Sequence, residues 1–97
     1  LQETRKKADP EELSAEAHFE AGQKWIQKKN CKRAINEFEL ARKKNPDLAP
    51  AWLRQIYCHQ KLKQNQQARE LAEELIDEKP QMAALPFIKK ILESKKK

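Results

Sequence analysis

The sequence contains a single glycine, no long apolar run and no run in which apolar and polar residues alternate. Alternation is the pattern of a half-buried strand, so its absence argues against a β-sheet. No apolar stretch approaches the roughly 18 residues that a membrane-spanning helix needs, so we expect no membrane insertion. A composition rich in Lys, Glu, Ala and Leu favours helices instead. The 97 residues are therefore expected to form one small all-α domain.

Cysteine is also scarce, and the two that occur do not form a metal-binding pattern. Cys31 and Cys58 lack the spacing that a zinc site would need with His18 and His59. We therefore expect no metal ion and no cofactor, and a chain with two incidental thiols in the reducing cytoplasm. The chain begins at Leu1 and has no signal-peptide pattern, which indicates a segment of a longer intracellular protein.

Motifs of catalysis are missing as well. There is no phosphate-binding glycine loop, no nucleophile elbow and no HExxH sequence. The acidic pairs Glu11-Glu12 and Glu73-Glu74 are adjacent in sequence, and adjacent residues of a helix point in different directions. His18 and His59 are expected at packing or surface positions. We predict that the chain is not an enzyme and has no catalytic residues.

The net charge of +6 lies mainly at the two ends of the chain. Residues 1–9 are expected to form a flexible basic tail, and residues 90–97 hold four lysines. A nucleic-acid-binding domain usually concentrates basic residues on one folded face. Two basic runs occur within the chain, at 28–33 and 42–44, but no aromatic residues are interleaved with them for base stacking. Nucleic-acid binding is therefore only a third hypothesis.

The helical spacing of apolar residues predicts five helices. They are expected at about 10–29, 32–44, 48–62, 66–78 and 82–95. Asp9 and Asp47 are expected to cap the first and third helices, and Pro86 provides an alternative first turn for the fifth. Each helix has one apolar stripe and the turns are short, so the helices are expected to pack as antiparallel neighbours.

Two pairs of residues share a spacing of 34. Pro46 and Pro80 are 34 residues apart, and so are Ala34 and Ala68. A fixed period of this length is typical of helical repeat proteins, in which each unit is a helix–turn–helix.

The first unit resembles the tetratricopeptide repeat (TPR), whose pattern is W-x2-L-G-x2-Y, then A-x3-F, then P. The matching residues are His18, Ala21, Gly22, Trp25, Ala34, Phe38 and Pro46. The resemblance implies a right-handed superhelical stack of antiparallel hairpins, with Gly22 where the two helices of the unit approach most closely. The expected domain covers 10–95, with repeats at about 15–48 and 49–82 and a capping helix at about 83–95.

The second unit keeps Trp52 and the 34-residue spacing but departs from the pattern at three positions. Ile56 replaces the glycine, His59 replaces the aromatic residue and Ala72 replaces the phenylalanine. We expect the third helix to be rotated or shifted relative to a standard unit, with Ile56 and Tyr57 supplying the packing.

The TPR resemblance also implies a concave groove, lined by the first helix of each repeat, that holds a peptide or helix of a partner. The groove residues implied are Phe19, Gln23, Ile26, Leu53, Arg54, Tyr57, Lys61, Phe87 and Ile91, with Glu16 and Gln27 beside them. The function implied is that of a scaffold or adaptor for a protein partner. The alternative is that a terminal helix folds back and fills the groove.

Some TPR proteins hold a C-terminal carboxylate with a clamp of Lys and Asn residues. The corresponding positions here are Phe19, Gln23, Arg54, Ala84 and Ile88, of which only Arg54 is basic. Because a carboxylate needs several convergent donors, we predict that this clamp is absent. Self-association is the second functional hypothesis, since about two and a half repeats would leave apolar surface exposed along Met82–Leu92.

Overall fold

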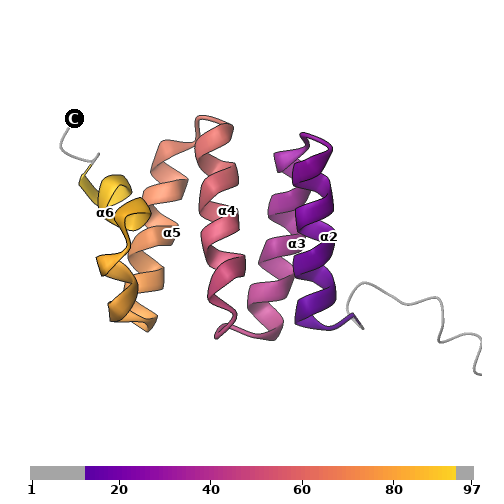
Figure 1. Ribbon diagram of the computed structural model, residues 1–97, viewed down its shortest axis with the longest axis horizontal. Helices are drawn as coiled ribbons and strands as arrows, with labels where there is room; N and C mark the ends of the chain where they lie inside the picture. Colours follow the sequence, from indigo (N-terminus) through magenta and orange to yellow (C-terminus); the bar gives the residue numbers. More distant parts are fainter. Residues whose placement is uncertain (1–12, 94–97) are drawn as a thin grey trace, which may run out of the picture.

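The structure is a computed structural model that describes residues 13–93, which form five α-helices and one short 3-10 helix. These are α2 (Ala15–Gln27), α3 (Cys31–Lys44), α4 (Ala49–Lys61), α5 (Asn65–Glu78), the 3-10 helix η2 (Pro80–Ala84) and α6 (Pro86–Glu93). The helices stand side by side in chain order, each antiparallel to the one before it (Figure 1). Residues 13–93 contain no strand. The expected all-α, repeat-like fold is confirmed.

The three central helices begin and end within one residue of their predicted bounds. The first helix differs, because Leu13 and Ser14 are not helical and α2 begins at Ala15. The Ser14 hydroxyl caps α2 by accepting a hydrogen bond from the N–H of Ala17 at 3.0 Å. The predicted cap at Asp9 and the predicted tail at 1–9 lie outside the described residues.

The predicted fifth helix is divided in two at Pro86. Leu85 is extended, with φ −70° and ψ 131°, between η2 and α6. A residue that precedes proline is pushed out of the α region by the proline ring, so a continuous helix over 82–95 was the wrong prediction. The alternative first turn at Pro86 is the observed one.

The 34-residue period is present in the backbone as well as in the sequence. Lys29, after α2, and Lys63, after α4, have φ angles of 62° and 63°. At each position the N–H of the lysine donates to a carbonyl of the preceding helix, and so does the N–H of the next residue. This pair of bonds is the Schellman motif, which ends a helix with one left-handed residue. Both hairpins therefore turn in the same way.

The two turns between hairpins are joined by an ion pair. Asp47 follows Pro46, and its carboxylate accepts a hydrogen bond from Nζ of Lys79, which precedes Pro80, at 2.9 Å. The predicted capping of α4 by Asp47 is therefore wrong. The cap residue is Leu48, whose aliphatic side chain can form no cap bond, and the carboxylate of Asp47 binds Lys79 of the neighbouring turn instead.

Gly22 of α2 packs directly against the ring of Phe38 of α3. A Cβ atom at position 22 would lie 2.5 Å from Cε1 of the Phe38 ring, well inside van der Waals contact. Phe38 is fully buried in a cluster with other residues of α3 and with Ala51 and Cys58 of α4. Only glycine leaves the ring this space.

The second hairpin has the opposite distribution of side-chain size. Ile56 occupies the position equivalent to Gly22, and Ala72 the position equivalent to Phe38. Both are 0% exposed and belong to one buried cluster formed by α4, α5 and α6. The predicted packing role of Ile56 is confirmed, whereas Tyr57, expected to share it, is 37% exposed.

Candidate interaction surface

Tyr57 projects from the middle of α4 and is one of two large apolar side chains exposed among residues 13–93. The other is Leu13, which is 36% exposed. Arg54 and Lys61 precede and follow Tyr57 by three and four residues, so all three lie on one face of the helix. Nζ of Lys61 is 5.9 Å from the centroid of the Tyr57 ring. This face of α4 combines an exposed aromatic ring with two cations.

A hollow of about 380 Å³ lies on one side of Tyr57, between α4 and α6. Its lining residues are Pro50, Leu53, Arg54, Tyr57 and Phe87. All of these except Pro50 were predicted as groove residues. We call this the α4–α6 hollow.

A second hollow, of about 440 Å³, lies between α4 and the end of α2. Its lining residues are Ile26, Gln27, Lys29, Cys31, Tyr57, Lys61 and Leu62. Of these, Ile26, Tyr57 and Lys61 were predicted groove residues and Gln27 was expected beside them. We call this the α2–α4 hollow. Since Tyr57 lines both hollows, they meet at its ring, and together they form what we call the Tyr57 surface.

Three of the predicted groove residues do not line either hollow. Phe19 is half-buried, and its ring lies 5.7 Å from that of Phe38, centroid to centroid. Gln23 is half-buried on α2. Ile91 is 3% exposed in the cluster formed by α4, α5 and α6. Ile91 therefore packs into the core of this structure rather than against either hollow.

The C-terminal helix forms a wall of the surface rather than a cover over it. α6 contributes Phe87 to the α4–α6 hollow and directs Ile88 and Ile91 into the core, while Tyr57 keeps its exposure. No large apolar side chain of the segment Met82–Leu92 is among the exposed ones. The larger apolar residues of the segment outside the core are half-buried, namely Met82, Leu85, Phe87 and Leu92, and self-association through it stays a prediction.

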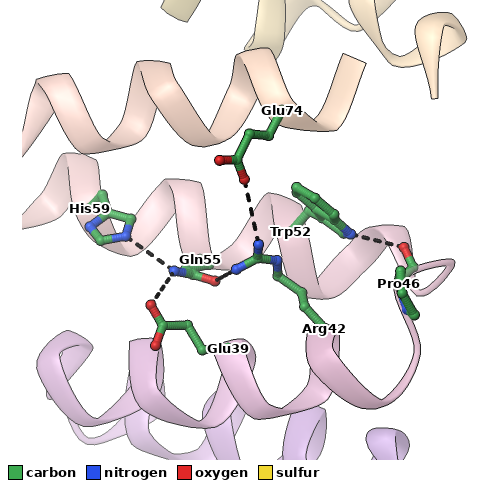
Figure 2. A network of polar contacts seen from close by, with 7 residues as sticks. All are labelled: Glu39, Arg42, Pro46, Trp52, Gln55, His59 and Glu74. Atoms are coloured by element: carbon green, nitrogen blue, oxygen red, sulfur yellow. Dashed lines mark hydrogen bonds and ion pairs between the residues drawn. The ribbon is translucent and has the colours of Figure 1, made fainter. Parts of the chain in front are cut away.

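A partly buried polar network centred on Gln55 joins α4 to α3 (Figure 2). Gln55 of α4 is 2% exposed. Its side-chain carbonyl accepts a bond of 2.8 Å from Nη1 of Arg42, and its amide donates to Oε2 of Glu39 at 3.3 Å. The same amide lies 3.3 Å from Nε2 of His59. Since the amide is the donor, that nitrogen accepts, and the Nδ1–H of His59 donates to Oε1 of Gln64 at 2.8 Å.

Arg42 also stacks on the indole of Trp52, with 4.2 Å between the guanidinium carbon and the ring centroid. The Trp52 Nε1–H donates to the carbonyl of Pro46 at 3.0 Å, and Glu74 of α5 lies 3.9 Å from Arg42. Burial lowers the pKa of the Arg42 guanidinium, and the charges of Glu74 and Glu39 act in the opposite direction. Arg42 therefore connects three helices.

The sequence did not indicate this network, because Arg42 stands in a basic run that is typical of a solvated helix end. A weak signal was available, since Gln55 and His59 are polar residues at the i and i+4 positions of a helix that is otherwise apolar on that side.

The two thiols lie beside the α2–α4 hollow. Cys58 is fully buried and Cys31 is half-buried. The pKa of the Cys58 thiol is raised, mainly by burial and then by a side-chain hydrogen bond with Cys31 and by the charge of Cys31.

The basic run at 28–33 has an aromatic neighbour that its sequence did not indicate, because Trp25 lies beside it in space. Lys28 and Arg33 are 5.6 and 5.0 Å from the Trp25 ring centroid.

Comparisons with protein-family models, with curated proteins and with solved structures found no match to this chain. Across residues 13–93, no helix is both long and apolar enough to cross a bilayer. The same residues contain no group of three or more His, Cys, Asp or Glu side chains that could hold a metal ion.

Proposed function

We propose that this chain is a short TPR-like array that acts as a protein-interaction module, a scaffold or adaptor that holds a peptide or helix of a partner at the Tyr57 surface. The observation that carries the proposal is that two hollows, supplied by different helices, meet at one exposed tyrosine. Exposed aromatic side chains that rise between apolar hollows are typical of the residues that contribute most to binding energy.

The support beneath the surface is rigid. α4 is held to α3 by the bonds of Gln55 with Arg42 and Glu39, and to α5 by the cluster that contains Ile56. A surface whose backbone is already ordered loses little conformational entropy when a partner binds, so small hollows suffice for measurable affinity. The proposal includes no catalytic role.

The experiment is a selection of peptides from a random display library against the immobilised chain. Selected peptides are then titrated, by fluorescence anisotropy, against the wild type and the variants Tyr57→Ser and Leu13→Ser. Leu13 is a matched control because it is the other exposed large apolar residue and has nearly the same exposure. We expect Tyr57→Ser to weaken binding by about tenfold or more and Leu13→Ser to leave it unchanged.

A result with no selected peptide, or with peptides equally sensitive to both variants, would contradict the proposal. Circular dichroism of each variant establishes that the helices are intact. Sedimentation of the unliganded chain tests self-association directly, since a dimer broken by Tyr57→Ser would mean that the surface is occupied by a second copy rather than by a different partner.

A further inference from the structure

The charge on the Tyr57 surface has one sign. Arg54 lines the α4–α6 hollow, and Lys29 and Lys61 line the α2–α4 hollow. Among residues 13–93, no aspartate or glutamate lines either hollow, and α4 itself contains no acidic residue. Acidic residues are instead abundant on α5, which has five of them.

Within residues 13–93, the cations Arg54, Lys61 and Lys29 form no ion pair. The ion pairs found there join Arg42 to Glu74 and Lys79 to Asp47, and His18 lies beside Glu37. None of them involves Arg54, Lys61 or Lys29. The contact of Lys61 with the ring of Tyr57 leaves its ammonium group exposed. Three positive charges on one apolar surface repel one another and are stabilised by an anionic ligand.

We propose that the Tyr57 surface binds an acidic segment of a partner protein. The segment places an apolar side chain in the α4–α6 hollow, against Leu53 and Phe87, and carboxylates beside Arg54 and Lys61. This inference rests on the proposed function and adds the chemical class of the partner. Side-chain carboxylates fit better than a chain terminus, because Arg54 is the sole basic residue among the clamp positions and a terminal carboxylate needs several convergent donors.

The apolar part of the surface favours a peptide over a nucleic acid. Leu53 and Phe87 in one hollow and Ile26 in the other offer contacts to aliphatic side chains, whereas a sugar–phosphate backbone has no apolar group of that kind. A nucleic acid held without sequence preference is usually bound by several aromatic rings in a basic groove. Among residues 13–93, only two aromatic residues line the hollows, and of these Tyr57 is exposed while Phe87 is half-buried.

The probes are three labelled peptides of identical length. The first is made of alternating blocks of leucine and glutamate. The second has lysine in place of every glutamate, and the third has serine in place of every leucine. Each is titrated by fluorescence anisotropy against the wild type, Arg54→Glu/Lys61→Glu, and the charge-matched control Lys32→Glu/Lys43→Glu. Lys32 and Lys43 are exposed on α3 and line neither hollow of the surface.

The acidic leucine peptide is expected to bind the wild type at least about tenfold more tightly than the other two. Its affinity should fall by a similar factor in Arg54→Glu/Lys61→Glu and little in the control variant. High salt should weaken it, since exposed charges are screened. A preference for the lysine peptide, or equal losses in both variants, would overturn the inference.

The outcome for the partner class is separate from the outcome for the proposed function. If library-selected peptides depend on Tyr57 but are neutral or basic and ignore charge reversal, the proposed function stands and the acidic partner is excluded. If a single-stranded oligonucleotide binds more tightly than the acidic peptide, with the same dependence on Arg54 and Lys61, the surface binds nucleic acid and the inference fails.

Discussion

The ring of Phe38 lies where the Cβ atom of any residue other than glycine at position 22 would be placed, with the nearest ring carbon 2.5 Å from that point. At the equivalent positions of the second hairpin, Ile56 and Ala72 are both fully buried. The large residue stands on the second helix of one hairpin and on the first helix of the other. The departures from the TPR pattern in the second unit are thus an exchange of volume between facing helices, not a loss of packing.

Substitution of Gly22 is expected to destabilise the chain. Gly22→Ala should lower the free energy of unfolding by a net value of about 1 kcal/mol. The overlap of the methyl group with a buried ring costs about 2 kcal/mol, and the higher helix propensity of alanine offsets about 1 kcal/mol of it. Urea denaturation measures the change. Phe38→Leu in the Gly22→Ala background makes room for the methyl group and should recover part of the loss. An unfolding free energy equal to that of the wild type would contradict the observed packing.

The exchange of volume in the second hairpin predicts coupling between two sites. Ile56→Gly leaves a cavity and should cost about 3–5 kcal/mol, while Ala72→Phe alone overpacks the same cluster. The double variant restores the arrangement of the first hairpin, so it should be more stable than the sum of the single changes predicts. A double-mutant cycle from urea denaturation checks this. Strict additivity would mean that the two residues do not share one space.

The left-handed lysines predict stabilising substitutions. Lys29→Gly and Lys63→Gly should each raise the free energy of unfolding by about 1 kcal/mol, because glycine adopts a positive φ angle without the steric cost that Cβ imposes. Thermal unfolding followed by circular dichroism gives the shift. Lys28→Gly is the matched control, since Lys28 has a negative φ of −89° and should gain nothing.

Removal of Gln55 should break three side-chain hydrogen bonds, including those that join α4 to α3. Gln55→Ala is expected to cost about 1–2 kcal/mol, because Arg42, Glu39 and His59 each lose a partly buried hydrogen bond. The measurement is again urea denaturation. Gln60→Ala, at an exposed position of the same helix, should change stability by less than about 0.5 kcal/mol.

The buried thiol predicts a loss of stability at alkaline pH. The pKa of Cys58 is raised in the folded chain, so the folded state keeps its proton where the unfolded thiol, with a pKa near about 8.5, has lost it. The stability that Cys58 contributes is therefore complete below about pH 8 and declines as the pH rises further. The urea concentration at the midpoint of unfolding should decrease as the pH is raised from about 7.5 to about 9.5. The decrease should be smaller in Cys58→Val. A pH dependence identical in the two proteins would contradict it.

Local rules predicted the helices well, and failed where distant residues intervene. The spacing of apolar residues and the prolines at 46 and 80 placed α3, α4 and α5 within one residue, because both act through neighbours in the chain. Asp47 looked like a cap from its position, but Lys79, 32 residues away, binds its carboxylate. No local pattern reports such a partner.

The candidate site shows the same contrast between features set by chain neighbours and features set by distant residues. Leu53, Arg54, Tyr57 and Phe87 come together as predicted, since the face of a helix is determined by its period. Ile91 instead lies in the buried cluster with α4 and α5, and contacts between distant helices of this kind cannot be read from the period of one helix. The network around Gln55 was missed since its members come from different helices, and each of them alone has an ordinary position in the sequence.

The core formed by residues 13–93 has two clusters, and α4 contributes to both. Trp52 and Ile56 belong to the cluster with α5 and α6, while Ala51 and Cys58 belong to the cluster with α3. A cut between the two hairpins, at Pro46–Asp47, would therefore leave the N-terminal fragment without part of its core. The two buried clusters therefore do not coincide with the two sequence repeats. A partner that binds at Tyr57 contacts α4, the helix that both clusters share. Binding there would therefore stabilise both clusters against local unfolding.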